Sequence, residues 1–279
     1  MFRCGRHTFK LDRPLVMGIV NVTPDSFFDG GRYLGTQAAI EHALRLKEAG
    51  ADILDVGGES TRPGARPVGL QEEMDRVIPV IEGLRDAGVA LSVDTMKPEL
   101  MRAALAAGAD MINDVNALRA AGALEAVADS TAGVCLMHMQ GEPRTMQLKP
   151  HYEDVVAEVA SFLAGRVEAA VAAGIARERI LVDPGFGFGK DLGHNLALFK
   201  GLSRFADIAP VLVGVSRKSM LGALTGRKTS DRLIASVTAA VLAIQRGAAV
   251  VRVHDVQETV DALKIWRALG EDLWEKRIE

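Results

Sequence analysis

The chain has 279 residues, of which 48% are hydrophobic and 25% are charged, and its formal net charge is −3. This composition is that of a globular protein and excludes an intrinsically disordered chain. Because proteins that bind nucleic acids or anionic membranes normally carry a basic face, the mild negative charge argues against both kinds of partner.

The sequence shows neither a cysteine motif nor an apolar targeting segment, and both observations bear on the cellular compartment. Cys4 and Cys135 lie far apart and form no CxxC pair, so neither a disulfide framework nor a zinc knuckle is predicted. The first ten residues have no apolar stretch of the secretory type, and the longest apolar run, residues 233–244, falls short of the roughly 20 residues of a membrane span. We therefore expect a soluble protein of the cytoplasm.

The regular elements begin with a short hairpin within residues 1–14, after which one unit recurs along the chain. Each unit is a short β-branched run followed by a segment with helical period, and helical segments end at glycines such as Gly50 and Gly108. The eight predicted strands lie near residues 15–20, 52–56, 89–93, 110–113, 133–137, 179–183, 211–214 and 249–253.

The predicted strands are nearly continuous runs of Val, Ile and Leu, which is typical of parallel strands covered on both faces. Eight strand-and-helix units without a Pro/Ser-rich linker favour an α/β fold in which residues 1–279 form one (β/α)8 TIM barrel domain. Residues 1–14 would be an N-terminal extension that plugs the bottom of the barrel. A doubly wound open sheet is the alternative, because periodicity does not show closure.

Polar side chains follow the predicted strands at their carboxyl ends, where barrel enzymes carry their active sites. Two long loops rich in Gly and Pro, residues 22–33 and 57–69, follow the first two strands and are predicted to cover this end. The polar residues are Asn21, Asp55, Asp94, Asn113, Asp114, His138, Asp183, Ser216, Arg217, Lys218, Arg252 and His254.

These residue types suit a planar heterocycle that carries an anionic group. A carboxylate accepts paired N–H donors from a ring edge, and an amide complements an adjacent acceptor. Arg62, Lys218, Arg252 and His254 indicate an anion site without a P-loop pattern. The side-chain oxygen of Asn21 suits a magnesium ion that keeps most of its waters and is held largely by substrate phosphates.

Not every polar residue is expected to act. Asp55 and Asp114 are predicted to cap helices or hold loops, and His138 is predicted to be a satisfied core histidine. The glycines of residues 183–190 have the wrong spacing for a dinucleotide site, and their loop is predicted to expose Phe186 and Phe188 to something flat. The predicted functional charges have no evident partner, and they are Asp94, Asp183, Lys218 and Arg252.

Eight segments spread over nearly the whole chain closely resemble the dihydropteroate synthase family of folate biosynthesis. They are MGIVNVTPDSFFDGG (17–31), DVGGESTRPGA (55–65), SVDT (92–95), IND (112–114), LMHMQG (136–141), VDPGFGFGK (182–190), VGVSRKSMLG (213–222) and RVHDV (252–256).

The resemblance implies a barrel transferase, usually a homodimer, that uses magnesium. It would condense 6-hydroxymethyl-7,8-dihydropterin pyrophosphate with p-aminobenzoate and release pyrophosphate and 7,8-dihydropteroate. By the same resemblance, Asp94, Asn113, Asp183 and Lys218 hold the pterin in a pocket lined by Met137, Phe188 and Gly214, and Asn21 meets the metal. Arg62, Arg252 and His254 hold the pyrophosphate, while Thr61, Pro63, Ser219, Phe27 and Phe28 frame the aminobenzoate.

With the resemblance, we expect the catalytic residues to be Asp94, Lys218, Arg252 and His254. Loss of pyrophosphate is the difficult event, so we expect an SN1-like substitution in which Asp94 favours positive charge in the pterin ring. Three alternatives are a methyltransferase that binds methyltetrahydrofolate, a catalytically silent relative, and a glycosidase that uses Asp94 and Asp183.

Overall fold

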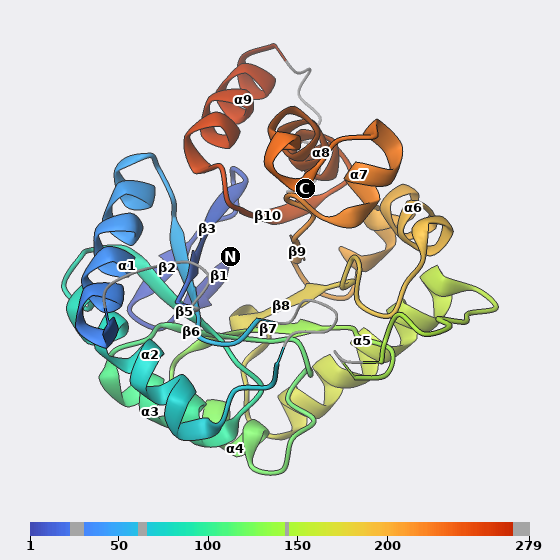
Figure 1. Ribbon diagram of the computed structural model, residues 1–279. Coiled ribbons are helices and arrows are strands. Elements are labelled where there is room, and N and C mark those ends of the chain that lie inside the picture. Colours follow the sequence, from blue (N-terminus) through green and yellow to red (C-terminus); the bar gives the residue numbers. More distant parts are fainter. Residues whose placement is uncertain (23–30, 61–65, 143–144, 270–279) are drawn as a thin grey trace.

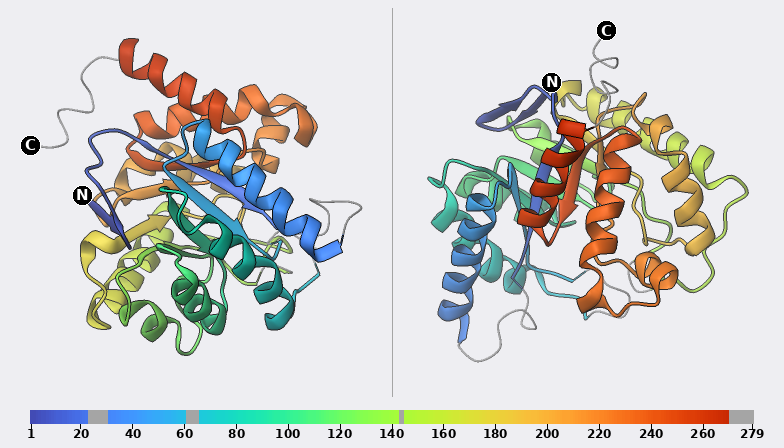
Figure 2. Two further views of the ribbon diagram at one scale, coloured as in Figure 1. Left: turned by 90° about the vertical axis from the view of Figure 1, so that its left-hand side faces the viewer. Right: turned by 90° about the horizontal axis from the view of Figure 1, so that it is seen from above.

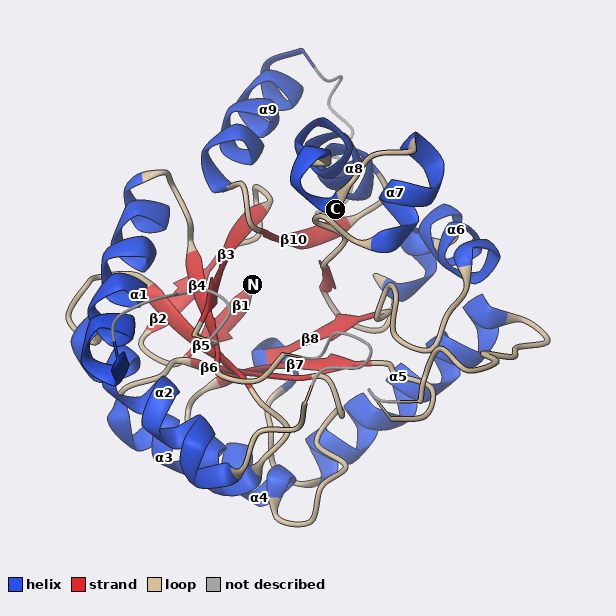
Figure 3. Ribbon diagram, in the orientation of Figure 1, coloured by secondary structure: helices blue, strands red, loops and turns tan. Residues whose placement is uncertain are grey.

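The computed structural model describes residues 1–22, 31–60, 66–142 and 145–269. In them, eight parallel strands form a closed barrel in the order β10-β3-β4-β5-β6-β7-β8-β9 (Figures 1 and 3). This confirms the predicted barrel and excludes the open sheet. The strands are β3 (Leu15–Asn21), β4 (Ile53–Gly57), β5 (Ala90–Asp94), β6 (Met111–Asp114), β7 (Gly133–Met137), β8 (Ile180–Asp183), β9 (Val211–Val213) and β10 (Ala248–Val253).

The helices lie in a ring outside the barrel (Figure 1). They are α1 (Gly31–Glu48), α2 (Leu70–Leu84), α3 (Pro98–Ala107), α4 (Ala123–Ala128), α5 (Val155–Ala172), α6 (Leu192–Lys200), α7 (Ser219–Thr225), α8 (Leu233–Gln245) and α9 (Val256–Leu269). Short 3-10 helices are η2 (Arg177–Arg179), η3 (Leu202–Phe205) and η4 (Thr229–Asp231). No helix in the described ranges is long and apolar enough to cross a membrane.

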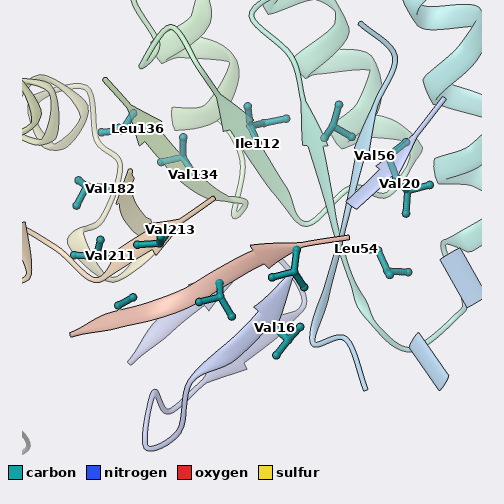
Figure 4. Close-up of a cluster of buried hydrophobic side chains, with 14 of the residues drawn as sticks. Val16, Val20, Leu54, Val56, Ile112, Val134, Leu136, Val182, Val211 and Val213 are labelled. Carbon is teal, nitrogen blue, oxygen red and sulfur yellow. The ribbon is translucent and has the colours of Figure 1, made fainter. Parts of the chain in front are cut away.

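The main core lies between the barrel and the ring of helices. Outward-facing strand residues such as Val20, Leu54 and Val134 are fully buried there (Figure 4). Because side chains alternate along a strand, their neighbours point into the barrel. At the carboxyl ends of the strands the inward residues are polar, which places the predicted site inside the mouth of the barrel.

The N-terminal hairpin closes the opposite end of the barrel, as predicted. It consists of β1 (Phe2–Cys4) and β2 (His7–Phe9), which pair antiparallel (Figure 2). Phe2 and Cys4 are fully buried in a second core with the inward residues at the starts of the strands, including Met17 and Leu181.

An ion pair fixes this hairpin to the barrel. The Nε atom of Arg6 lies 2.9 Å from Oδ1 of Asp110, and its Nη2 lies 2.9 Å from Oδ2. Burial raises the pKa of Asp110, but the hydrogen bonds from Arg6 and from the Leu91 backbone outweigh it and hold that pKa below its ordinary value.

Candidate active site

An ion-paired triad of one buried and two half-buried side chains lies at the barrel mouth. Arg252 on β10 donates from Nε to Oδ2 of Asp55 on β4 at 2.6 Å, and from Nη2 to Oδ2 of Asp94 on β5 at 2.9 Å. Asn113 on β6 donates from Nδ2 to the same Asp55 oxygen at 3.0 Å. The guanidinium group thereby joins β10, β4 and β5, and the Asp55 carboxylate links β6 to them through Asn113.

Two predictions about these charges were wrong. Asp55 neither caps a helix nor holds a loop: it is fully buried in the middle of a strand, because its neighbours Leu54 and Val56 face outward and leave it pointing inward. Asp94 and Arg252 looked partnerless but are paired with each other. The prediction for Asp114 is confirmed, since its carboxylate accepts from the backbone N–H groups of Asn116 and Leu118 at 2.7 Å each.

The triad has an electrostatic consequence for Asp94. Its burial and the neighbouring Asp55 carboxylate raise the pKa of Asp94, while Arg252 opposes that rise. Burial disfavours the Arg252 cation, but Asp55 and Asp94 outweigh burial and raise the pKa of Arg252 well above its ordinary value. The guanidinium is therefore always charged. Because the pKa of Asp94 is raised to about 7, the triad has a net charge of −1 above that pH and is close to neutral below it.

Asp183 and Lys218 form a second corner of the mouth. Oδ1 of Asp183, at the end of β8, accepts from the backbone N–H of Gly185 at 2.7 Å. Lys218 donates from Nζ to the carbonyl of Phe186, and the same Nζ lies 4.6 Å from the ring centroid of Phe188. Burial raises the pKa of Asp183 against the opposing effect of Lys218, and burial lowers the pKa of Lys218 to about 8.

The loop of residues 184–190 forms this corner and corrects one prediction. Phe188 is half-buried beside Lys218, where a flat ligand could reach it, but Phe186 is fully buried and packs against Phe199 with ring centroids 5.8 Å apart. The two phenylalanines differ because left-handed glycines on either side turn them to opposite faces. The strictest of these glycines is Gly185 (φ +72°), where a Cβ atom would lie 1.9 Å from the carbonyl oxygen of His138.

His138 is a core residue, as predicted. It is buried at the end of β7, packs edge-on against Phe162 with centroids 4.9 Å apart, and accepts a hydrogen bond at Nδ1 from Lys190 Nζ at 2.9 Å. Burial, aided by the charge of Lys190, lowers the pKa of His138 to about 3, so the ring is neutral. Lys190 escaped the sequence analysis, although a lysine that directly follows Gly-Phe-Gly at the end of a tight loop was a usable signal.

Other predicted residues surround these two corners. Met137 is buried in a cluster with Val115, Met139 and Met146, against which Phe188 packs. A Cβ atom on Gly214 would lie 3.8 Å from Cβ of Arg252, so Gly214 lies beside the triad. The remaining predicted residue on this side is Ser219, the exposed first residue of α7.

The end of β10 leads to His254, which lies beside the loop after β9. Its Nδ1 atom lies 3.0 Å from Oγ of Ser216, and its backbone N–H donates to the same oxygen at 3.2 Å. Arg217 pairs with Asp255 and has a left-handed backbone (φ +59°), a strained conformation that places the next residue, Lys218, at the mouth.

The first strand places Asn21 half-buried at its carboxyl end, in register with Gly57 and, through it, with Asp94. The other predicted residues of the two long loops are Phe27, Phe28, Thr61, Arg62 and Pro63, and these five lie outside the described residues.

Comparisons with known proteins agree with this arrangement. A family model for the pterin binding enzymes matches residues 17–254. A dihydropteroate synthase of Neisseria meningitidis serogroup B is 52% identical over 281 residues, which cover 98% of this chain and 99% of the relative. The chain belongs to the dihydropteroate synthase family. Another dihydropteroate synthase, from Escherichia coli K12, is 50% identical over 274 residues, covering 98% of this chain and 97% of that protein.

Solved structures of this family share the fold. A Xanthomonas albilineans dihydropteroate synthase with 4-aminobenzoic acid has a TM-score of 0.88 and 58% identity, covering 93% of this chain and 94% of that one. A Burkholderia cenocepacia dihydropteroate synthase complexed with 7,8-dihydropteroate has a TM-score of 0.89 and 51% identity, covering 100% and 98%.

Proposed function

We propose that the chain condenses 6-hydroxymethyl-7,8-dihydropterin pyrophosphate with p-aminobenzoate, giving 7,8-dihydropteroate and pyrophosphate in folate biosynthesis. It would thus act as a transferase of a pterin-methyl group. The observation that carries the proposal is the meeting of Asp94, Asn113, Asp183, Lys218 and Arg252 in one barrel mouth, in a chain about half identical to dihydropteroate synthases over nearly its full length.

The pterin ring fits the corner formed by Asp183, Lys218 and Phe188. The aminopyrimidinone edge presents adjacent N–H donors, which a carboxylate accepts in pairs, so Asp183 is its natural partner. Lys218, whose pKa of about 8 leaves it a cation at neutral pH, donates to a ring acceptor. Asn113, Met137 and Gly214 complete the pocket, and the half-buried ring of Phe188 supplies an apolar wall.

The proposed chemistry follows from charge. An aniline nitrogen is already neutral near pH 7, so p-aminobenzoate needs positioning more than it needs a general base. In an SN1-like substitution, the bond from the methylene carbon to the pyrophosphate oxygen breaks first, and positive charge spreads into the pterin ring. Asp94 stabilises that charge when it is ionised, while His254 and Arg252 hold the departing anion.

Magnesium fits the same site by its chemistry. The side chain of Asn21 offers a hard oxygen ligand at the mouth, and in the described part of the chain no group of three His, Cys, Asp or Glu side chains could hold a metal ion by itself. An ion that keeps its waters and is bound mainly through substrate phosphates suits such a donor set. When bound, it neutralises charge on the pyrophosphate.

The aminobenzoate would lie toward Ser219, at the exposed start of α7. Its other proposed neighbours are Thr61, Pro63, Phe27 and Phe28, while Arg62 would bind the pyrophosphate. Support comes from the Xanthomonas albilineans relative, which is described with 4-aminobenzoic acid.

Assembly and location belong to the same proposal. A homodimer is supported by apolar side chains on the outer face of α8, where Ile234 is 81% exposed. A cytoplasmic location is supported by the two free thiols, Cys4 and Cys135, both of which are buried. Light scattering coupled to size-exclusion chromatography tests the dimer.

The decisive experiment measures pyrophosphate release from the dihydropterin pyrophosphate with magnesium, with and without p-aminobenzoate. Dihydropteroate is followed by chromatography in the same samples. Release that requires the amine and matches the product in amount supports the synthase. Pterin binding without release would instead support the silent relative or the methyltransferase.

A further inference from the structure

We propose that Lys190 is a positioning residue for the pterin half of the site: it holds the loop that carries Phe188 and backs Asp183 and Lys218. This inference rests on the proposed function, since it concerns how that function's pterin pocket is built. Lys190 lies behind the pocket wall and is only 2% exposed.

The contacts of the ammonium group are matched to its three donors. Nζ lies 2.9 Å from each of three acceptors, which are Nδ1 of His138 and the carbonyl oxygens of Gly185 and Phe188, and 3.4 Å from the carbonyl oxygen of His138. An ammonium has three N–H bonds and no acceptor, so the three shorter contacts satisfy the protonated form, which dominates below the pKa of about 7 to which burial lowers Lys190. All three partners are uncharged, which is unusual for a buried lysine and identifies the group as a clamp on the backbone rather than half of an ion pair.

The clamp joins two neighbouring segments of the mouth. Gly185 and Phe188 belong to the loop after β8, whereas His138 directly follows β7. The loop is already pressed against the β7 segment, because a Cβ atom at Gly189 (φ +62°) would lie 2.4 Å from the carbonyl oxygen of Gln140. Lys190 bridges the two segments here, and the hydroxyl of Tyr152 adds a second contact by donating to the carbonyl of Gly189 at 2.9 Å.

The clamped loop touches the groups proposed to bind the pterin. The N–H of Gly185 donates to Asp183 Oδ1 at 2.7 Å, and Lys218 donates to the carbonyl of Phe186 while lying over the Phe188 ring. The carbonyl of Phe188 is itself a Lys190 acceptor. If the clamp is lost, the carboxylate, the ammonium of Lys218 and the aromatic wall all lose a fixed neighbour at once.

On the aminobenzoate side, Ser219 is the one proposed residue within the described ranges. It begins α7 directly after Lys218, and among the described residues no hydrogen bond joins it to the loop of residues 184–190. A positioning role therefore predicts a selective effect on the pterin, whereas a general loss of stability would affect both substrates.

Lys190→Met tests this, because it keeps the length of the side chain and removes every donor. We expect the KM for the pterin pyrophosphate and the dissociation constant of 7,8-dihydropteroate to rise about 10- to 100-fold, as for other misplaced binding groups. The KM for p-aminobenzoate should stay within about twofold. Lys200→Met at the exposed end of α6 is the matched control and should change neither constant.

A second pair of variants covers the case in which Lys190→Met does not fold. His138→Asn retains an acceptor near the position of Nδ1, and His138→Leu removes it, while both lose the ring packing against Phe162. The asparagine variant should bind the pterin several-fold more tightly than the leucine variant.

Calorimetric titration with 7,8-dihydropteroate reads binding without turnover, so the inference and the proposed function fail separately. If the unmodified chain makes no dihydropteroate, the function fails. Parallel rises in both KM values in Lys190→Met, or equal pterin affinities in the two His138 variants, would overturn the positioning role while leaving the function intact.

Discussion

Replacing Arg252 with methionine tests whether the triad is a balanced unit. In the structure, the Asp55 side chain is 0% exposed, Asp94 14% and Arg252 21%. Removing one partner of a buried ion pair costs about 3–5 kcal/mol, because it leaves an uncompensated buried charge. Arg252 is partly reached by water, so we expect the lower end, about 3 kcal/mol at pH 7. At 2–4 °C per kcal/mol, the unfolding temperature should fall by about 6–12 °C.

The double variant Arg252→Met with Asp55→Asn separates charge from packing. Asparagine keeps the shape of Asp55 and can still accept from Nδ2 of Asn113. It removes one uncompensated charge, so the double variant should be more stable than the single one by at least about 1 kcal/mol, although it carries two substitutions.

The pH dependence of the stability of Arg252→Met provides a second test of the triad. Without Arg252, which opposes the rise, the pKa of Asp94 in the folded state moves further above its unfolded value. A raised folded pKa means that the folded state binds more protons, so stability falls as the pH rises through the interval between the two values. The deficit of Arg252→Met relative to the unmodified chain should therefore be smaller at pH 5 than at pH 7.

Urea unfolding followed by circular dichroism at both pH values measures these differences. The reasoning is refuted if Arg252→Met costs less than about 1 kcal/mol at pH 7, or if the double variant is no more stable than the single one.

Three further predictions concern the mouth of the barrel. Asp183→Ala removes a charge-assisted contact worth about 1.5–3 kcal/mol and should weaken pterin binding about 10- to 100-fold in calorimetry, with little change for aminobenzoate; equal losses would count against its role. Because Lys218 is a cation only below its pKa of about 8, kcat/KM for the pterin substrate should fall above that pH, and Lys218→Arg should move this alkaline limb upward; an unmoved limb would assign it to another group. Gly185→Ala should destabilise the fold by about 2 kcal/mol more than Gly226→Ala, since both have positive φ but only Gly185 lacks room for a Cβ atom; equal thermal shifts would contradict this.

The barrel was predictable because its signals are local. Strands buried on both faces read as apolar runs, as in residues 15–20, and several of them, including β3, β5 and β8, end at a polar residue that the barrel then gathers at one mouth. The hairpin was equally visible, because Phe2 and Cys4 alternate with Arg3 and so present one apolar face.

The incorrect predictions concern which way a side chain points within its strand or loop. Asp55 lies between Leu54 and Val56, and nothing in that string says which face of the strand is the barrel interior until the register with β3 and β5 is known. Phe186 and Phe188 look alike in sequence, and only the left-handed turns at the glycines between and beside them send one into the core and the other to the mouth. The orientation of these side chains depends on strand register and turn conformation in three dimensions, which composition and hydrophobic period do not specify.

The position of Asp55 changes how the charges of the site divide between the two halves of the reaction. Arg252 alone would be an anion site, but here two of its N–H groups are committed to Asp55 and Asp94, so the ionised triad is negative overall. In the proposed reaction, an ionised triad beside the pterin favours positive charge on the ring as the methylene bond to pyrophosphate breaks. The same proposal has the pyrophosphate bound by His254 and by those N–H groups of Arg252 that do not donate to Asp55 or Asp94. The commitment of two N–H groups to carboxylates therefore divides Arg252 between the two halves of the reaction.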